Sequence, residues 1–260
     1  MLSLAHVSAG YDGREVLHDL SFDVRGGENL CILGPNGCGK TTLLKAIAAL
    51  IPSSGDIQID GVSVKKMKRQ EIASRIAVMS QMSTMTFPFS VEETVMLGRY
   101  QHMKRGLFSR PSRQDREAVT QCLEATGLTD LAQRPIDELS GGQLQRVFLA
   151  RTLAQEPEII LLDEPTNHLD LKHQAELVDY LKAWSNEQNH CVIGVLHDIN
   201  LALRLSNRLL FMKKGDIAGI GDAQELLSPV FLERLYGMDV VGYMLESLKK
   251  WEVFSHERAI

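Results

Sequence analysis

A glycine-rich segment lies between a predicted strand and a predicted helix near the start of the chain. This segment, Gly34–Thr42, reads Gly-Pro-Asn-Gly-Cys-Gly-Lys-Thr-Thr. It follows the mostly apolar run Asn29–Leu33 and leads into Thr41–Leu50, where apolar residues recur at helical spacing before a proline. Glycines let backbone N–H groups approach a ligand closely, and a helix N-terminus attracts anions. The segment therefore fits the phosphate-loop pattern G-x-x-x-x-G-K-[ST] and predicts a nucleotide-binding α/β core.

The side chains of this loop have separate expected roles. Lys40 is expected to reach the β- and γ-phosphates, and the Thr41 hydroxyl is expected to ligate Mg²⁺. The expected nucleotide-binding residues here are Asn36, Gly37, Cys38, Gly39, Lys40, Thr41 and Thr42. A chance glycine-rich turn is the alternative interpretation, and the flanking strand and helix make it the weaker one.

Two carboxylates end a second apolar run. Asp163 and Glu164 directly follow Ile159–Leu162. Parallel sheets bind ligands at the carboxyl ends of their strands, so both carboxylates are expected beside the glycine loop. Asp163 then suits Mg²⁺, directly or through water, and Glu164 suits the general base that polarises the attacking water. An acidic turn before Pro165 is the alternative, and it is disfavoured because the glycine loop is also present.

Strand-like and helix-like segments alternate along the chain. Strands are expected at Leu4–Val7, Leu20–Val24, Asn29–Leu33, Gly55–Gly61, Arg75–Gln81, 159–163, 191–196 and 208–212, and helices at Thr41–Leu50, 172–187 and 198–205. Such alternation predicts a mostly parallel sheet covered by helices. The stretch 88–156 is helical in pattern, with a capping box at Ser90 and Glu93, an amphipathic segment Arg113–Ala125 and a helix over Gly142–Ala154.

Composition excludes several classes of protein. The net charge of −5 gives no global attraction for nucleic acid, so no nucleic-acid partner is expected. No apolar stretch approaches the roughly 18 residues that span a bilayer, and the N-terminus shows no export signal. The four cysteines lack C-x-x-C or metal-ligand spacing, which favours reduced thiols. We therefore expect a cytoplasmic location.

Three motifs occur in the order and spacing of the ATP-binding cassette (ABC) ATPases, which the chain resembles over almost its whole length. They are Gly34–Thr42, Leu139–Gln143 with the sequence Leu-Ser-Gly-Gly-Gln, and Ile159–Glu164. The resemblance implies Mg²⁺-dependent hydrolysis of ATP. It also implies a P-loop NTPase core with a mixed, mostly parallel sheet, an N-terminal antiparallel β part and an inserted α-helical subdomain. On this basis we expect the RecA-like core in 1–87 and 157–235, the helical subdomain in 88–156, and a C-terminal extension in 236–260.

Single positions match other functional residues of that family. Tyr11 matches the aromatic residue that stacks on adenine, with an ordinary strand-end tyrosine as the alternative. Gln81 matches the glutamine that senses Mg²⁺ and the attacking water. His197 matches the histidine that contacts the γ-phosphate, and Asp170 matches the aspartate that communicates across the dimer. His168 departs from the family, which commonly has a small residue at this position.

The resemblance also implies a head-to-tail homodimer. In this family, the serine and glycines of the second motif complete the phosphate site of the partner subunit. The matching residues are Ser140, Gly141, Gly142 and Gln143. They begin a predicted helix, so their N–H groups offer a positive helix end to a γ-phosphate.

Shorter and less specific sequence similarities indicate which transport process ATP hydrolysis drives. Gly98–Tyr100, Gly106–Ser112, Asn167–Leu171 and Leu235–Val240 resemble importers of iron siderophores, haem and cobalamin. Such an importer implies a transmembrane permease as partner, docked in a groove formed by the helical insertion and the region around Gln81. It also implies an indirect role for a substrate-binding protein and a peripheral location at the cytoplasmic face of the membrane.

Several functions are alternatives to an iron-siderophore importer. A cobalamin or haem importer is the nearest alternative, and a soluble ABC ATPase of iron–sulfur cluster assembly is the alternative from another class. A DNA-repair or chromosome-organising cassette would need a long heptad coiled coil, and the sequence has none. The segment Arg99–Arg116 holds six basic residues against Asp115 alone, which fits either a site near an anionic leaflet or a solvated basic loop. The run Lys65–Arg69 favours a solvated surface.

Overall fold

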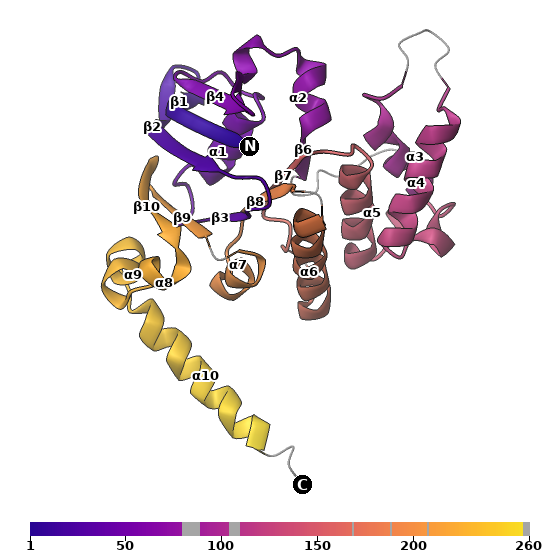
Figure 1. The fold of residues 1–260 in the computed structure, drawn as a ribbon. Coiled ribbons are helices and arrows are strands. Elements are labelled where there is room, and N and C mark those ends of the chain that lie inside the picture. The colour runs from indigo at the N-terminus through magenta and orange to yellow at the C-terminus, as the bar shows by residue number, and fades with distance from the viewer. Residues whose placement is uncertain (80–88, 104–109, 168, 188, 207, 257–260) are drawn as a thin grey trace.

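The computed structural model describes residues 1–79, 89–103, 110–167, 169–187, 189–206 and 208–256 (Figure 1). Its strands are β1 (Leu2–Tyr11), β2 (Arg14–Val24), β3 (Leu30–Leu33), β4 (Asp56–Ile59), β5 (Val62–Ser63), β6 (Ile76–Met79), β7 (Ile159–Asp163), β8 (Cys191–Val195), β9 (Arg208–Lys213) and β10 (Asp216–Asp222). Its α-helices are α1 (Lys40–Ile47), α2 (Arg69–Arg75), α3 (Val91–Met96), α4 (Arg113–Ala125), α5 (Gly141–Leu153), α6 (Leu171–Glu187), α7 (Ile199–Leu205), α8 (Ala223–Leu226), α9 (Pro229–Tyr236) and α10 (Val240–His256).

The strands form two sheets with different hydrogen-bonding patterns. The smaller sheet has the order β2-β1-β4-β5 and is antiparallel throughout. The larger sheet has the order β10-β9-β3-β8-β7-β6, and its neighbours are parallel except β9 and β10. Burial alternates along much of β1 and β2, whereas every residue of β3 and β8 is buried. The larger sheet is therefore covered on both faces, as mostly parallel sheets require. The expected α/β fold class, with a separate antiparallel N-terminal part, is confirmed.

Helix α1 packs between the two sheets. Its buried residues Leu43, Leu44 and Ile47 belong to one apolar cluster that also contains Val7 of β1 and Ile32 of β3. The opposite face of the larger sheet is covered by α5, α6, α7 and α9, whose buried residues form a second cluster with that face. The first helix after the glycine loop is therefore held from both sides.

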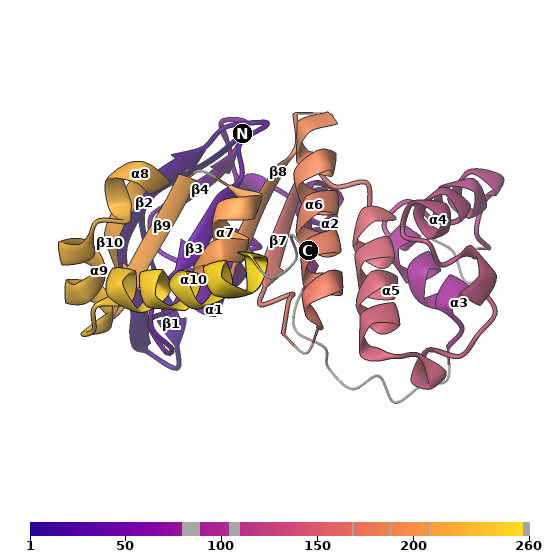
Figure 2. The same ribbon diagram turned by 90° about the horizontal axis from the view of Figure 1, so that it is seen from below.

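Helix α5 has two buried faces. Phe148 and Leu149 join the cluster on the larger sheet, while Val147 and Ala150 join a third cluster with α3 and α4. Figure 2 shows α5 beside α6, on the side away from β9 and β10, with α3 and α4 farther out. This helix therefore connects the helical part of the chain to the sheet.

Most long elements agree with the sequence predictions. The strands expected at 159–163, 191–196 and 208–212 are confirmed as β7, β8 and β9, each within one residue. The predicted capping box is also present, because Ser90 Oγ accepts a hydrogen bond from Glu93 N (3.1 Å) and Glu93 Oε2 accepts one from Ser90 N (2.8 Å).

Some boundaries and short elements differ from the predictions. The expected end of the first helix at Leu50 is wrong, because α1 ends at Ile47 and Ala49 takes a left-handed φ of 53°. Arg75 ends α2 and does not begin a strand; β6 runs over Ile76–Met79, and the last two residues of the predicted strand lie outside the described residues. Gln81 lies outside the described residues. No prediction was made for α2, β10 or the helices α8 to α10.

Helix α10 extends away from the two sheets (Figure 1). It lies in the C-terminal segment for which no structure was predicted. Several large apolar side chains on it are exposed, including Tyr243, Leu248 and Trp251. Among the described residues, no helix combines the length and the hydropathy needed to cross a bilayer.

The segment that was predicted to be a basic surface begins with a buried arginine. Arg99 is 2% exposed, and its Nε donates to Asp115 Oδ1 at 3.1 Å. Its Nη1 donates to the Ala154 carbonyl at 2.9 Å and lies 3.0 Å from Glu156 Oε1. Burial alone would raise the pKa of Asp115, but hydrogen bonds from Ser112 and the Arg99 guanidinium hold it below its ordinary value. The expectation of a solvated charge at Arg99 is therefore wrong, and Lys104 and Arg105 lie outside the described residues.

We predict that Asp115→Ala lowers the free energy of unfolding by about 3 kcal/mol, because it removes one partner of a buried guanidinium. Urea denaturation of the full chain measures the loss. Glu117→Ala on the same helix is the matched control, since Glu117 pairs with the exposed Arg113 (2.7 Å) and such pairs contribute under about 1 kcal/mol. Equal losses of unfolding free energy in the two variants would contradict the prediction. They would show that Glu156 and the Ala154 carbonyl are sufficient to compensate the buried charge of Arg99.

Candidate active site

The glycine loop joins β3 to α1 and depends on residues without side chains. Gly34 has φ 146° and Gly39 has φ 107°, conformations that L side chains rarely adopt. A Cβ on Gly34 would lie 2.3 Å from the Met212 carbonyl oxygen, and one on Gly39 would lie 2.8 Å from Leu17 Cδ2. The loop is therefore pressed against β9 and β2 and curls over the N-terminus of α1.

Lys40 is held inside this loop. The residue is 5% exposed, and its Nζ donates hydrogen bonds to the carbonyl oxygens of Gly34 (2.9 Å) and Pro35 (3.1 Å). These contacts place an ammonium group within the concave backbone segment. A cation and several backbone N–H groups thus converge at one helix N-terminus, which is an arrangement suited to phosphate.

Thr41 and Asp163 meet beside the loop although they lie 122 positions apart in the sequence. The Thr41 hydroxyl donates to Asp163 Oδ1 at 2.9 Å. Burial raises the pKa of Asp163, opposed by the hydrogen bond from Thr41, while the Glu164 carboxylate raises it further. The pair places a hydroxyl and a carboxylate at the edge of the phosphate loop, as the sequence predicts.

Glu164 is held in a specific orientation by its neighbours. It adopts a left-handed φ of 54°, a conformation that costs about 1–2 kcal/mol for a residue with a side chain. Its N–H donates to the Val195 carbonyl at 3.1 Å. Glu164 Oε1 lies 2.5 Å from His197 Nε2, and Glu164 Oε2 accepts a hydrogen bond from Asn167 Nδ2 at 2.7 Å. Sequence reasoning did not assign a role to Asn167, although its position three residues after Glu164 in the same turn is a usable signal.

A cavity of about 350 Å³ gathers most of the predicted glycine-loop residues together with Glu164 and His197. It is lined by Val16, Asn36, Gly37, Gly39, Lys40, Thr41, Thr42, Glu164 and His197. Val16 was not predicted, since nothing in the sequence marks it. Cys38 belongs to the loop but does not line the cavity; its side chain is buried, and this burial raises the pKa of its thiol. Tyr11 lies outside the lining and is 41% exposed, with Lys45 Nζ 5.8 Å from the centre of its ring.

The family model described as ABC transporter matches residues 17–167, which include the loop, the cavity residues from Asn36 to Glu164 and Leu139–Gln143. The chain belongs to the ABC transporter family. It is an ATP-binding subunit with ATPase chemistry, and its P-loop NTPase fold is the one that the sequence predicts.

Relatives of this ABC ATPase include two iron-transport subunits. The ferric enterobactin transport ATP-binding protein of Escherichia coli is 39% identical over 233 residues, which cover 89% of this chain and 85% of the relative. The iron(3+)-hydroxamate import ATP-binding protein of Bacillus subtilis is 37% identical over 239 residues, covering 92% and 88%.

Two solved structures show the same fold. An inward-facing ABC transporter described as of the metal-chelate type matches with a TM-score of 0.80 and 30% identity, covering 92% of this chain and 89% of the other. A dimeric ATP-binding cassette in a post-hydrolysis state, bound to ADP and phosphate, matches with a TM-score of 0.73 and 30% identity, covering 85% and 98%.

The second motif of this ABC ATPase lies away from the nucleotide cavity. Ser140 is the N-cap of α5, and its Oγ accepts a hydrogen bond from Gln143 N at 3.3 Å. Gln143 Oε1 in turn accepts one from Ser140 N at 2.9 Å. None of Ser140, Gly141, Gly142 and Gln143 lines the cavity that holds Lys40. The second motif is therefore separate from the chain's own nucleotide cavity.

Asp170 also stands apart from the nucleotide cavity. Its Oδ1 accepts hydrogen bonds from His173 N (2.9 Å) and lies 2.7 Å from His173 Nδ1. The backbone hydrogen bond from His173, then the one from its ring, lower the pKa of Asp170. Gln81 and His168 lie outside the described residues, so the predictions for them stay predictions.

The oxygen donors at Thr41 and Asp163 fit a Mg²⁺ ion. Mg²⁺ in nucleotide sites usually takes one or two protein oxygens and completes its shell with phosphate oxygens and water. Among the described residues, no three His, Cys, Asp or Glu side chains gather into a metal cluster. The four cysteines are free thiols, and burial raises the pKa of both Cys31 and Cys191 to about 12. The thiols are thus poor metal ligands, whereas the hydroxyl of Thr41 and the carboxylate of Asp163 suit Mg²⁺.

We predict that Asp163→Asn raises the melting temperature at neutral pH while it removes the carboxylate that is expected to bind Mg²⁺. The pKa of Asp163 is raised by folding, so its stabilising contribution is present below pH 3.8 and is lost as the pH rises through the raised pKa. Asparagine can still accept the Thr41 hydrogen bond without a buried charge. Thermal unfolding measured between neutral pH and pH 3.8 should therefore show that the variant's gain in melting temperature shrinks as the pH falls.

Asp179→Asn is the control for this prediction. Arg204 lowers the pKa of Asp179 through side-chain hydrogen bonds, so its ionised form is favoured by folding. This variant should show no gain at neutral pH. A lower melting temperature for Asp163→Asn at neutral pH would contradict the prediction that the ionised Asp163 carboxylate destabilises the folded protein.

Proposed function

We propose that this chain is the ATPase subunit of an importer that takes up an iron–siderophore complex or a similar metal chelate. ATP hydrolysis is supported by one observation above all, the Glu164 carboxylate held between His197 and Asn167 at the cavity that contains Lys40. The cargo class is supported by the names of the relatives, which are described as transporting ferric enterobactin and iron(3+)-hydroxamates. Haem or cobalamin uptake is the neighbouring alternative. No observed contact favours iron–sulfur cluster assembly.

In the proposed reaction, each site residue acts on a defined part of the nucleotide. Lys40 and the loop N–H groups bind the phosphates, and Tyr11 stacks on adenine. Glu164 accepts the proton of the attacking water, and His197 orients that carboxylate and contacts the γ-phosphate. Thr41 and Asp163 would hold Mg²⁺, which would supply charge neutralisation on the phosphate oxygens. The part of Gln81 in sensing the metal and the water rests on the resemblance alone.

A second copy of the chain would complete each site. The N-terminus of α5 is capped by Ser140 and Gln143 and is absent from the chain's own nucleotide cavity. In a head-to-tail dimer, Ser140, Gly141, Gly142 and Gln143 would meet the γ-phosphate bound to the partner, and Asp170 would lie at the dimer contact. The solved relative in a dimeric state supports this arrangement for a cassette of this fold.

A permease would dock where the core meets the helical subdomain. We assign 1–87 and 157–235 to the core, 88–156 to the helical subdomain and 236–260 to a C-terminal extension. A cavity of about 430 Å³ lies between the end of α1, α2 and β6, and Gln155 after α5 also lines it. Leu50 on its rim is 64% exposed. This apolar depression is our proposed seat for a cytoplasmic loop of the permease, which would hold the chain at the cytoplasmic face and connect it indirectly to a substrate-binding protein.

We predict that Glu164→Gln lowers the rate of ATP hydrolysis by about 100-fold or more, because glutamine cannot accept a proton from water. ATP binding should persist, and the variant should accumulate as a closed dimer on size-exclusion chromatography with ATP. Glu233→Gln, an exposed change on α9, is the control and should keep normal turnover. Near-normal hydrolysis by Glu164→Gln would overturn the general-base assignment.

We predict that Ser140→Arg lowers the rate of hydrolysis by about 100-fold, since a bulky side chain at the start of α5 blocks the partner's γ-phosphate. ATP affinity of the isolated monomer, measured by equilibrium binding, should stay within about twofold of the unaltered chain. A mixture with Glu164→Gln chains should recover hydrolysis, because one of the two sites in the mixed dimer is then intact. An equal loss of monomer affinity would argue against the role in the partner's site.

A further inference from the structure

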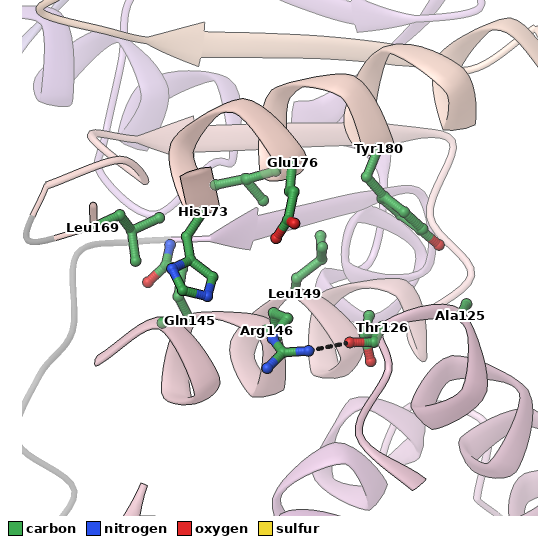
Figure 3. Close-up of a pocket in the computed structure, with 11 residues that line it drawn as sticks. Ala125, Thr126, Gln145, Arg146, Leu149, Leu169, His173, Glu176 and Tyr180 are labelled. Atoms are coloured by element: carbon green, nitrogen blue, oxygen red, sulfur yellow. Dashed lines mark hydrogen bonds between the residues drawn. The ribbon is translucent and has the colours of Figure 1, made fainter. Parts of the chain in front are cut away.

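A buried glutamine on α5 reaches the turn that carries Glu164. Gln145 is 8% exposed, and its Nε2 donates a hydrogen bond of 2.6 Å to the carbonyl oxygen of Pro165. Pro165 directly follows Glu164 in the sequence. Figure 3 shows the Gln145 side chain directed from α5 toward Leu169, at one wall of a cavity between α5 and α6. The bond therefore joins α5 to the segment that leads from β7 to α6.

The turn that receives this bond has an unfavourable backbone conformation. Glu164 has a left-handed φ of 54°, although a residue before proline favours extended backbone. A conformation of this kind persists only where the surrounding structure holds it. The N–H of Glu164 donates to the Val195 carbonyl at 3.1 Å on the side of the sheet, and Gln145 holds the next carbonyl from the side of α5. Loss of the Gln145 bond would therefore release one restraint on this turn.

Helix α5 is a firm anchor for that restraint. Leu149, one turn after Gln145, packs in the cluster on the larger sheet, and Val147 packs in the cluster with α3 and α4. At the start of the helix, the ring of His173 stands against Gly142, where a Cβ would lie 3.1 Å from the ring. Because α5 is held at these points, a bond from it fixes the position of the carbonyl that it reaches.

Gln145 holds this turn from outside the nucleotide cavity. It does not line the cavity that contains Lys40, Glu164 and His197. Gln145 and Pro165 are both buried, and a hydrogen bond in such surroundings is stronger than one in water. Any effect of Gln145 on the chemistry must therefore pass through the residues that it holds.

We propose that Gln145 is a positioning residue for ATP hydrolysis. It holds the Pro165 carbonyl, and thereby the turn after β7, so that the Glu164 carboxylate points at the attacking water. Asn167 and His197 orient the carboxylate itself, whereas Gln145 fixes the backbone from which that side chain projects. The proposal rests on the proposed role of Glu164 as general base.

The variant Gln145→Met tests the proposal, because methionine has a similar length and cannot donate a hydrogen bond. We expect kcat for ATP hydrolysis by the full chain to fall about tenfold, the rate equivalent of one net hydrogen bond. KM for ATP should stay within twofold, since the bond acts on the general base and not on nucleotide binding.

Thr152→Val is the matched control on the same helix. It removes a buried side-chain hydrogen bond, from Thr152 Oγ1 to the Phe148 carbonyl at 2.8 Å, without contact to the turn, and should keep kcat within twofold. Normal kcat in Gln145→Met, with hydrolysis lost in Glu164→Gln, would overturn the positioning role and leave the general base in place. Near-normal hydrolysis by Glu164→Gln would overturn both.

Mixed dimers separate positioning of Glu164 from simple support of α5. In a mixture of Ser140→Arg and Glu164→Gln chains, the intact site takes Glu164 from the first chain and Ser140 from the second. Gln145→Met added to the Ser140→Arg chain should lower hydrolysis by the mixture about tenfold, and added to the Glu164→Gln chain it should leave the rate within twofold. An equal loss in both cases, or a loss only in the second, would overturn the positioning role. A parent mixture that recovers no hydrolysis would refute the head-to-tail arrangement, and the kcat of the single variant would then decide the role of Gln145.

Discussion

The packing of α1 between two sheets is the constraint on which the nucleotide site depends. Leu43, Leu44 and Ile47 are buried among residues of both sheets, so the helix has no freedom to shift along its axis. Lys40 and Thr41 occupy its first turn, and the adjacent strands β3, β7 and β8 end at the same edge. Asp163 and Glu164 arrive there from β7, and His197 arrives just after β8. The polar residues of the site come from three separate stretches of sequence. Their positions thus depend on apolar contacts made by other residues.

The site contains local features that oppose stability, and the apolar clusters offset them. Asp163 keeps a carboxylate where burial raises its pKa, and Glu164 holds a left-handed backbone conformation. Both are adjacent residues at the end of β7, whose preceding residues are completely buried. Because the strand cannot move without opening two clusters, the turn after it can carry strain. The hydrogen bonds from Asn167 and His197 then select one orientation of the Glu164 carboxylate.

The sequence predicted the features that follow from local pattern, and it missed those that depend on distant contacts. The glycine loop, the run ending in Asp163 and the capping box at Ser90 are each encoded within a few residues, and each was located correctly. Arg99 was misinterpreted because its charge suggests solvent, whereas its burial depends on Ala154 and Glu156, over fifty residues later. Val16 carries no motif, so only the fold shows that it borders the site. The short helix α2 has too few turns for an apolar period to emerge.

Helix α5 is the element through which distant parts of the molecule can affect one another. Its N-terminus carries Ser140, one buried face packs with α3 and α4, and another packs on the larger sheet and α6. A rigid helix held in two clusters cannot move at one end alone, since each cluster would lose close-packed contacts. In the proposed importer, a permease loop seated against Gln155, just after α5, would therefore displace this helix together with the N–H groups proposed to face the partner's γ-phosphate. In the proposed dimer, a γ-phosphate bound at that helix end would act on the docked partner through the same helix, which would couple nucleotide binding to partner docking.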